Sequence, residues 1–312
     1  MMRSSATSSR QSNELDKYEL GIGAWSWGDK LFWEFYKEYG DEDAFSVYKE
    51  SLNLGITFID TAEVYGSGES ERLIGRFIAE TKQPVFIATK FMPYPWRLTR
   101  SSLMSALSKS LKRLGLPRVD LYQINTPNPP VPTTVWVEEM AKLQMKGLIG
   151  SVGVSNYNVT QTENAILTLK KFGMKLASNQ VEYNLLNRSI EKDGLLSLCR
   201  QEGIRVIAYS PLGQGLLTGK YSSENPPSGI RGMRYHNQLK TVIPLITLLR
   251  KLGDQYGGKT PAAVAINWTI CKGTLPIPGA KSVQQLTQNA GALGWRLSAD
   301  DIALLDEMSE AG

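Results

Sequence analysis

The chain of 312 residues contains little cysteine and histidine: Cys199, Cys271 and a single histidine, His236. The cysteines lie far apart in segments of helical period, so neither a disulfide framework nor a metal site built on paired cysteines is supported. We interpret both as buried thiols. The sequence therefore predicts no disulfide and no bound metal.

Long hydrophobic runs and long basic runs are also missing. The best apolar run, Val242 to Leu249, is interrupted by Pro244 and Thr247 and is shorter than the roughly 18 residues a membrane span needs. Lys and Arg number 35 against 30 Asp and Glu, with the signs interspersed along the chain. We expect no membrane insertion and no nucleic-acid partner, and we interpret the mild basicity as a preference for a small anionic ligand.

The first 13 residues are rich in serine, carry Arg3 and Arg10 and contain no acid. This composition is typical either of the remnant of an organellar transit peptide or of an ordinary frayed terminus. The first interpretation places the protein in an organelle such as the plastid and the second in the cytoplasm. In both cases we expect a flexible tail over 1–17 and a folded domain over 18–312.

Short apolar runs alternate with longer segments of helical period, which is the pattern of repeated βα units and a parallel sheet. Strands are predicted at 19–25, 57–60, 85–90, 119–124, 149–154, 177–182, 204–209 and 275–278. Helices are predicted at 41–54, 69–80, 99–114, 133–146, 159–172, 189–202, 260–272 and 283–293, with extra helices at 241–256 and 298–309. With no long Pro-, Gly- or Ser-rich linker, this arrangement predicts one α/β domain, a (β/α)8 TIM barrel.

A doubly wound dinucleotide-binding sheet is the competing fold, and it requires a GxGxxG turn after the first strand. The segment GIGAWSWG at 21–28 lacks the third glycine, and GQGLLTG at 213–219 has the wrong spacing. The barrel is therefore favoured. Its irregular stretches at 26–40 and 210–240 follow strands, so we expect them on the face where barrels keep their chemistry.

Asp60 and Lys90 end neighbouring predicted strands, and Tyr65 follows Asp60 in a loop that contains Gly66 and Gly68. Side chains at the carboxyl ends of barrel strands converge, so we expect these three to meet. A neighbouring ammonium favours the anion of a phenol and lowers its pKa. The trio is therefore predicted to give a proton to a developing alkoxide, a general acid step worth about 10² to 10⁴ in rate.

The last predicted strand runs through Gly279, Lys281 and Ser282 into a helix, so backbone N–H groups, the helix dipole and an ammonium point at one spot. Barrels often bind phosphate there, between the loops after strands 7 and 8. The long loop after strand 7 adds glycines, Lys220 and Arg231. A simple helix cap by Ser282 is the alternative interpretation.

Several motifs occur in an order that resembles the aldo-keto reductases over nearly everything after residue 18. They are GIGAWSWGD, FIDTAEVYGSGESERLIG, FIATK, VDLYQI, GLIGSVGVSNY, NQVEYNLL, IAYSPLGQGLLTGKY and IPGAKSVQQLTQNAGAL. The resemblance implies hydride transfer between NADP(H) and a carbonyl, with a tetrad of Asp, Tyr, Lys and His. Matching the motifs puts the first three members on Asp60, Tyr65 and Lys90. The fourth position holds Asn125 instead of histidine.

The same resemblance implies a set of cofactor-binding positions. Ser155, Asn156 and Gln180 would hold the nicotinamide carboxamide, and Tyr209 would stack on its ring. Lys281 and Ser282 would contact a 2′-phosphate, which favours NADPH over NADH. The remaining implied cofactor positions are Gly23, Trp25, Ser210, Leu212, Gly215, Leu217, Lys220, Gln285, Gln288 and Asn289. Gln288 stands where a glutamate is common.

Asparagine at position 125 can donate a hydrogen bond but cannot titrate, so orientation of the carbonyl survives while proton relay is lost. We expect a slow but genuine reductase. The β subunits of voltage-gated potassium channels resemble this chain and also carry asparagine there, so a regulatory or sensor protein that binds cofactor with little turnover is the alternative. The substrate pocket is expected to be walled by Trp27, Trp33, Tyr94 and Trp96, which favours an aldehyde on an aromatic or medium-length apolar body.

Overall fold

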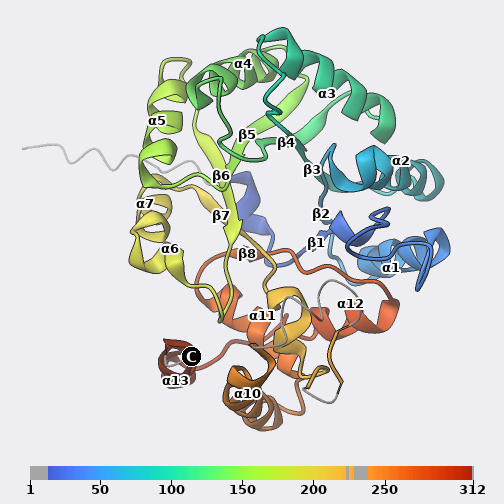
Figure 1. Cartoon of the computed structure of the whole chain (residues 1–312), viewed down its shortest axis with the longest axis vertical. Helices are drawn as coiled ribbons and strands as arrows, with labels where there is room; N and C mark the ends of the chain where they lie inside the picture. The colour runs from blue at the N-terminus through green and yellow to red at the C-terminus, as the bar shows by residue number, and fades with distance from the viewer. Residues whose placement is uncertain (1–12, 223–224, 228–237, 311–312) are drawn as a thin grey trace, which may run out of the picture.

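Eight parallel strands follow one another around a barrel in chain order, each paired with the next (Figure 1). The computed structural model describes residues 13–222, 225–227 and 238–310. The strands are β1 Gly21–Gly23, β2 Phe58–Asp60, β3 Phe86–Phe91, β4 Val119–Ile124, β5 Ile149–Ser155, β6 Leu176–Glu182, β7 Arg205–Tyr209 and β8 Leu275–Pro276. The backbone N–H of Gly23 donates to the carbonyl of Pro278 over 3.2 Å and links the first strand to the segment after the last. The predicted TIM barrel is confirmed.

The helices form a ring around the strands (Figure 1). They are α1 Asp41–Asn53, α2 Glu69–Thr81, α3 Ser101–Leu114, α4 Thr133–Met145, α5 Val159–Lys170, α6 Ser189–Lys192, α7 Leu195–Glu202, α9 Gln238–Thr241, α10 Ile243–Gln255, α11 Pro261–Cys271, α12 Val283–Ala290 and α13 Ala299–Glu310. The single helix predicted over 189–202 is divided in two. Gly194 adopts a left-handed conformation (φ 87°) between the halves, and the side chain of Asp193 accepts from the N–H of Leu195 to start the second.

The barrel interior is closed at the end opposite the strand carboxyl termini by the segment before β1. A short 3₁₀ helix, η1 Glu14–Lys17, places Leu15 (0% exposed) against Phe58 and Phe86 inside the barrel. The side chain of Asn13 fixes the segment by donating to the carbonyls of Ala177 and Gly203. Of the tail predicted over 1–17, the last five residues are therefore part of the folded body. The Ser- and Arg-rich residues 1–12 lie outside the described residues.

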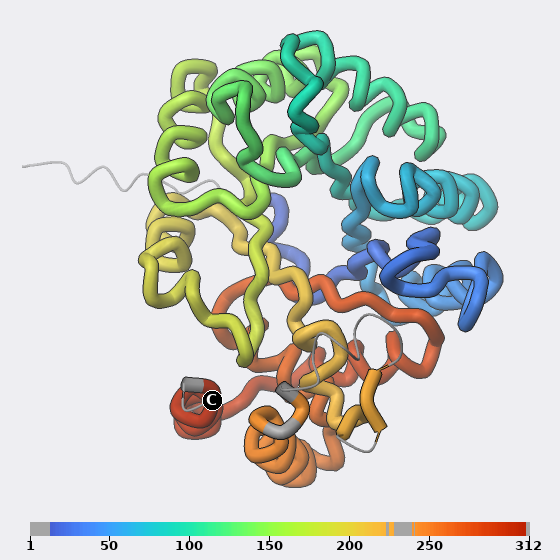
Figure 2. The backbone as a smooth tube through the Cα atoms, viewed as in Figure 1, coloured from blue at the N-terminus to red at the C-terminus, as the bar shows by residue number. Residues whose placement is uncertain are grey.

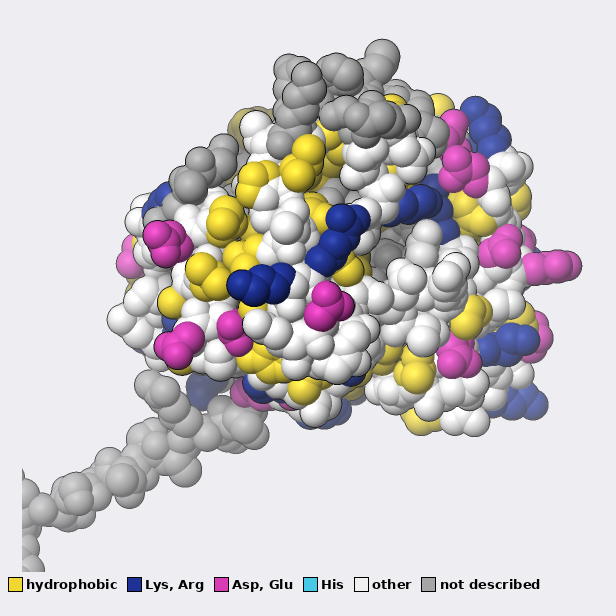
Figure 3. Space-filling model, turned by 90° about the horizontal axis from the view of Figure 1, so that it is seen from below, with side chains coloured by type: hydrophobic (Ala, Val, Ile, Leu, Met, Phe, Trp, Pro, Cys, Tyr) yellow, Lys and Arg dark blue, Asp and Glu magenta, His cyan; other side chains and the backbone are white. Residues whose placement is uncertain are grey.

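No helix in the described part of the chain is both long enough and apolar enough to cross a membrane. Figure 3 shows acidic and basic side chains interspersed over the visible face, with no continuous basic area. This pattern agrees with the interspersed charges of the sequence.

Replacing Leu15 with alanine tests whether this segment is a structural plug. We expect Leu15→Ala to lower the free energy of unfolding by about 2–4 kcal/mol, because a fully buried leucine leaves a cavity when truncated. Leu167→Ala, the same change at a side chain that is 57% exposed, is the control and should cost far less. Urea unfolding curves of the two variants make the comparison. Equal losses would mean that the segment contributes nothing to the core.

Candidate active site

Three ionisable side chains meet at the carboxyl ends of β2 and β3. Lys90 Nζ donates to Asp60 Oδ1, to the carbonyl oxygen of Thr61 at 2.9 Å and to the phenol oxygen of Tyr65 at 3.2 Å. Asp60 and Lys90 are each only 1% exposed. Parallel pairing of β2 with β3 sets Asp60 opposite Ala88, two residues before Lys90 on the neighbouring strand, and the structure brings together the trio expected from the strand ends.

Tyr65 reaches Lys90 because the chain turns sharply just after it. Gly66, Ser67 and Gly68 all have left-handed backbone conformations, with φ of 55°, 56° and 87°. A Cβ atom on Gly66 would lie 2.4 Å from the carbonyl oxygen of Gly28, so only glycine fits there. The turn leads directly into α2 and leaves the phenol on the barrel mouth.

Burial and neighbouring charges shift the pKa values of Tyr65 and Lys90. Loss of solvent raises the pKa of Tyr65 above its usual value of 10.0, and the nearby Lys90 ammonium offsets only part of that rise. The prediction of a lowered pKa for Tyr65 is therefore wrong, because it did not include desolvation. Burial also lowers the pKa of Lys90, but Asp60 and Tyr65 together raise it above its usual value. The pair at neutral pH is a neutral phenol beside an ammonium.

The second carboxylate oxygen of Asp60 is held by two amides from the opposite side of the barrel. Gln180 Nε2 donates to Asp60 Oδ2 at 2.8 Å, and Gln123 Nε2 donates to the same oxygen at 3.2 Å. Sequence reasoning missed Gln123. Its signal was available, because alternation along β4 puts Gln123 on the same face as Leu121, inside the barrel, where an amide needs a partner.

Asn125 follows β4 and lines the same cavity as Tyr65. Its backbone N–H donates to the carbonyl of Phe91 at 2.8 Å, and its side-chain amide donates to the thioether sulfur of Met92 at 3.4 Å. Asn156 Nδ2 donates to the carbonyl of Asn125 at 3.1 Å. A thioether is a weak acceptor, so the amide of Asn125 is available for a better one.

The cavity above this trio has a volume of about 830 Å³ and extends from Tyr65 to the start of α12. Nearly all of the implied cofactor positions line it: Gly23, Trp25, Ser155, Asn156, Gln180, Tyr209, Ser210, Leu212, Gly215, Lys220, Lys281, Ser282, Gln285, Gln288 and Asn289. Leu217 is the exception. Its side chain is fully buried in the core and does not line the cavity.

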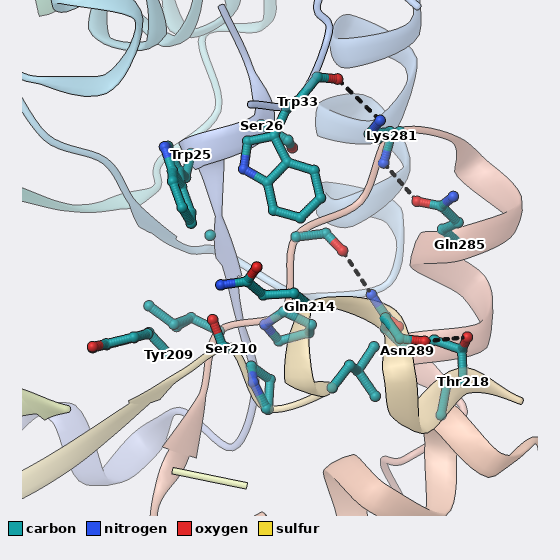
Figure 4. Close-up of a pocket in the computed structure, with 18 of the residues that line it drawn as sticks. Trp25, Ser26, Trp33, Tyr209, Ser210, Gln214, Thr218, Lys281, Gln285 and Asn289 are labelled. Carbon is teal, nitrogen blue, oxygen red and sulfur yellow. Dashed lines mark hydrogen bonds between the residues drawn. The ribbon is translucent and has the colours of Figure 1, made fainter. Parts of the chain in front are cut away.

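Tyr209 and Asn156 are oriented by each other on the cavity wall. The phenol of Tyr209 donates to Asn156 Oδ1 at 3.1 Å. Asn156 and the adjoining Ser210 both have left-handed backbones, with φ of 60° and 49°. Such strain in residues other than glycine is concentrated at functional sites. Figure 4 shows Tyr209, Ser210 and Gln214 on one side of the cavity and the indoles of Trp25 and Trp33 on the other.

The far end of the cavity is formed by the first turn of α12. Ser282 Oγ accepts from the backbone N–H of Gln285, so the helix-cap interpretation of Ser282 is correct, and the residue still faces the cavity. Asn289 Nδ2 donates to the carbonyl of Gly279. Lys281 Nζ donates to the carbonyl of Trp33 at 3.0 Å and to Glu38 at 3.1 Å (Figure 4 draws the first of these).

Of the expected substrate walls, only Trp33 lines the cavity. Trp27 is fully buried and its indole N–H donates to the carbonyl of Ala280, so it is a core residue and the prediction is wrong. Tyr94 and Trp96 stack on each other with ring centroids 4.5 Å apart, and Trp96 is 73% exposed, so these rings lie outside the cavity. The aromatic wall is instead Trp25, which stacks on Phe32 and approaches Tyr65.

Sequence reasoning also missed Ser26, Glu38, Gln214 and Thr218, which line the cavity. Ser26 is the most informative, because its buried hydroxyl has no hydrogen-bond partner among the described residues. An orphaned buried hydroxyl on a cavity wall fits a polar ligand. Arg231 and His236 lie outside the described residues.

Replacing Gly66 with alanine tests the turn that presents Tyr65. An alanine at position 66 must keep the left-handed backbone conformation, which costs about 1–2 kcal/mol for a residue with a Cβ atom. Its Cβ atom must also displace Gly28. Gly55→Ala is a matched control, because Gly55 has φ of 72° and open space around its Cβ position. We expect Gly66→Ala to lose about 1–3 kcal/mol more than the control in urea unfolding. Equal losses would show that the contact with Gly28 does not constrain the turn.

The sequence profile of the aldo/keto reductase family matches residues 19–310. Among curated proteins, the chloroplastic pyridoxal reductase of Arabidopsis thaliana is 40% identical over 295 residues, covering 90% of this chain and 80% of that protein. The L-glyceraldehyde 3-phosphate reductase of Escherichia coli K12 is 30% identical over 285 residues, covering 84% of this chain and 82% of that protein.

Comparison with solved structures gives the same result as comparison with curated sequences. The glycerol dehydrogenase of Gluconobacter oxydans superposes with a TM-score of 0.81 at 26% identity, covering 93% of this chain and 90% of that one. An aldo/keto reductase of Klebsiella pneumoniae in complex with NADP and acetate has a TM-score of 0.73 at 27% identity, covering 93% and 91%. With the barrel, the trio of Asp60, Tyr65 and Lys90 and the family profile in agreement, the chain belongs to the aldo/keto reductase family.

Proposed function

We propose that the protein reduces aldehydes and ketones to alcohols with NADPH and that Tyr65 is the general acid. The observation that carries the proposal is the contact of Lys90 with both Asp60 and Tyr65 at the floor of the large cavity. Such a trio is suited to the donation of a proton from a phenol whose anion is stabilised by an ammonium.

The residues of the cavity fit a dinucleotide phosphate. A volume of about 830 Å³ lies within the range of cofactor pockets. The hydroxyls of Ser26 and Ser282, the N-terminus of α12 and the ammonium of Lys281 are suited to phosphate oxygens. Asn156 and Gln180 line the same cavity as Tyr65, and their amides would hold the nicotinamide carboxamide. The relative from Klebsiella pneumoniae in complex with NADP supports this assignment.

NADPH, when bound, supplies the hydride for the carbonyl carbon. Tyr65 then transfers its proton to the carbonyl oxygen, and the resulting phenolate is stabilised by the Lys90 ammonium at 3.2 Å. Asp60 keeps Lys90 charged and directed, since it pairs with the ammonium while Gln123 and Gln180 occupy its other oxygen. The raised pKa of Tyr65 keeps the phenol protonated at neutral pH, which is the form that reduction needs.

Asn125 takes the position that the family gives to histidine. Its amide has only the Met92 sulfur as acceptor among the described residues, so it can donate to a substrate carbonyl instead. An amide orients the carbonyl but cannot deliver a proton. We therefore infer a slow reductase in which proton transfer rests on Tyr65 alone.

The substrate class we propose is an aldehyde on an aromatic ring. Trp25 lies between Phe32 (centroids 5.1 Å apart) and Tyr65 (6.2 Å), and Trp33 packs edge-on against it at 5.6 Å. Flat aromatic walls favour a planar substrate that stacks. Pyridoxal, an aldehyde on a pyridine ring, has this shape and is named in the 40% identical plant relative.

Replacing Tyr65 with phenylalanine tests the proposed acid. We expect the purified protein to oxidise NADPH when pyridoxal or 4-nitrobenzaldehyde is added, and Tyr65→Phe to lower kcat by at least about 10²-fold because no other donor takes its place. Absorbance at 340 nm measures the rate, and cofactor fluorescence checks that the variant still binds NADPH. Tyr94→Phe, outside the cavity, is the control. Unchanged turnover in Tyr65→Phe would remove the assigned acid.

Replacing Asn125 with histidine tests the missing family residue. The unmodified protein should show a reductive kcat/KM that is flat from about pH 6 to 9, because the pKa of Tyr65 is raised above its usual value and loss of its proton falls at still higher pH. Asn125→His adds a group that titrates near pH 6.5, so activity should rise about tenfold and increase as pH falls through that value. Tight NADPH binding with no turnover in either protein would instead support the sensor alternative.

A further inference from the structure

Two segments far apart in the chain are joined across the mouth of the cavity. The loop after β1 (residues 27–40) lies beside the segment between β8 and α12 in the backbone view of Figure 2, and Glu38 Oε2 accepts from Lys281 Nζ at 3.1 Å. The carbonyl of Trp33, in the same loop, accepts from the same ammonium at 3.0 Å. The rings of Tyr39 and Trp33 lie within 4.6 and 5.5 Å of it. The β1 loop therefore supplies two acceptors and two aromatic rings to the ammonium of Lys281.

We propose that Glu38 sets the cofactor preference of this protein by competing with the 2′-phosphate of NADPH for Lys281. The inference rests on the proposed function, in which Lys281 contacts that phosphate. A carboxylate and a phosphate bound to one ammonium are close like charges, and each opposes the binding of the other. NADH carries a ribose hydroxyl at the same place, and a hydroxyl can donate to the carboxylate. Glu38 thus weakens NADPH binding and supports NADH binding.

Contacts that do not involve the Glu38 carboxylate also hold the β1 loop, and they remain when that carboxylate is removed. Asp29 Oδ1 accepts from the N–H groups of Phe32 and Trp33 and closes the loop upon itself. The phenol of Tyr39 donates to the carbonyl of Ser26 at the loop base. Glu38 is 48% exposed, whereas Lys281 is 17% exposed. A half-exposed carboxylate that pairs with a part-buried cation is a tuning group and not a core ion pair.

The experiment compares Glu38→Gln with the unmodified protein in titrations of NADPH and of NADH, followed by nicotinamide fluorescence. Glu34→Gln is the matched control, because it removes the same charge from the same loop where the carboxylate pairs with Lys37 at 3.6 Å. We expect Glu38→Gln to tighten NADPH binding by about fivefold, the size of a partly exposed charge pair, and to leave NADH binding unchanged or weaker. The gain should shrink as salt is raised.

A double-mutant cycle shows whether the effect acts through Lys281. In a Lys281→Gln background, Glu38→Gln should change the affinity for NADPH by clearly less than in the unmodified protein, because the competition for the cation is gone and only the direct repulsion of the two anions remains. An effect of Glu38→Gln that is equally large in that background would overturn the proposal, since it would come from general charge and not from the shared ammonium.

The other possible results of the cofactor titrations also test the proposal. If Glu38→Gln binds NADPH no more tightly than Glu34→Gln does, Glu38 does not compete and the inference fails while the proposed function stands. If Glu38→Gln binds NADPH more weakly, Glu38 positions Lys281 for the phosphate, which is the opposite role. If the unmodified protein binds neither cofactor, the proposed function fails first and this inference fails with it.

Discussion

The structure depends on a positive charge buried inside the barrel, the ammonium of Lys90. Lys90 is a lysine on a barrel strand with 1% of its side chain exposed, and an unpaired ammonium in such a place costs several kcal/mol. Asp60 supplies the opposite charge. The carbonyl of Thr61 and the phenol oxygen of Tyr65 accept the other hydrogen bonds that the Lys90 ammonium donates. The ammonium can therefore stay charged inside the barrel, and Tyr65 is fixed to it.

The surrounding residues extend this constraint outward. Gln123 and Gln180 satisfy the other oxygen of Asp60 from β4 and β6, so the pair is braced from three sides of the barrel. The turn through Gly66 brings Tyr65 back over the mouth. A proton donor built in this way needs little rearrangement when a carbonyl arrives, which is the condition for effective electrostatic catalysis.

Much of this could be predicted from the sequence. Alternating apolar runs and helical segments gave all eight strands within a few residues, and polar residues at strand ends pointed to Asp60 and Lys90. Predictions from local sequence patterns failed where burial or a long-range contact determines the position of a side chain. Trp25 and Trp27 look equivalent in GIGAWSWG, but the 3₁₀ turn Ala24–Ser26 breaks the alternation, so Trp25 lines the cavity and Trp27 enters the core.

Other features lie outside the reach of any single segment. The pKa of Tyr65 follows from desolvation, which the motif does not encode. The contact of Glu38 with Lys281 joins residues 243 positions apart, and no local pattern in either segment predicts it. The division of the helix predicted at 189–202 was available from Asp193-Gly194, because a glycine at that spacing is a common helix end.

The most direct test of the account is a crystal structure of the protein with NADPH. The account predicts that the phenol oxygen of Tyr65 remains on Lys90 and lies about 3–4 Å from the place where the substrate carbonyl oxygen meets the reactive carbon of the nicotinamide. A nicotinamide bound away from Tyr65, or a phenol that leaves Lys90 when the cofactor enters, would contradict it.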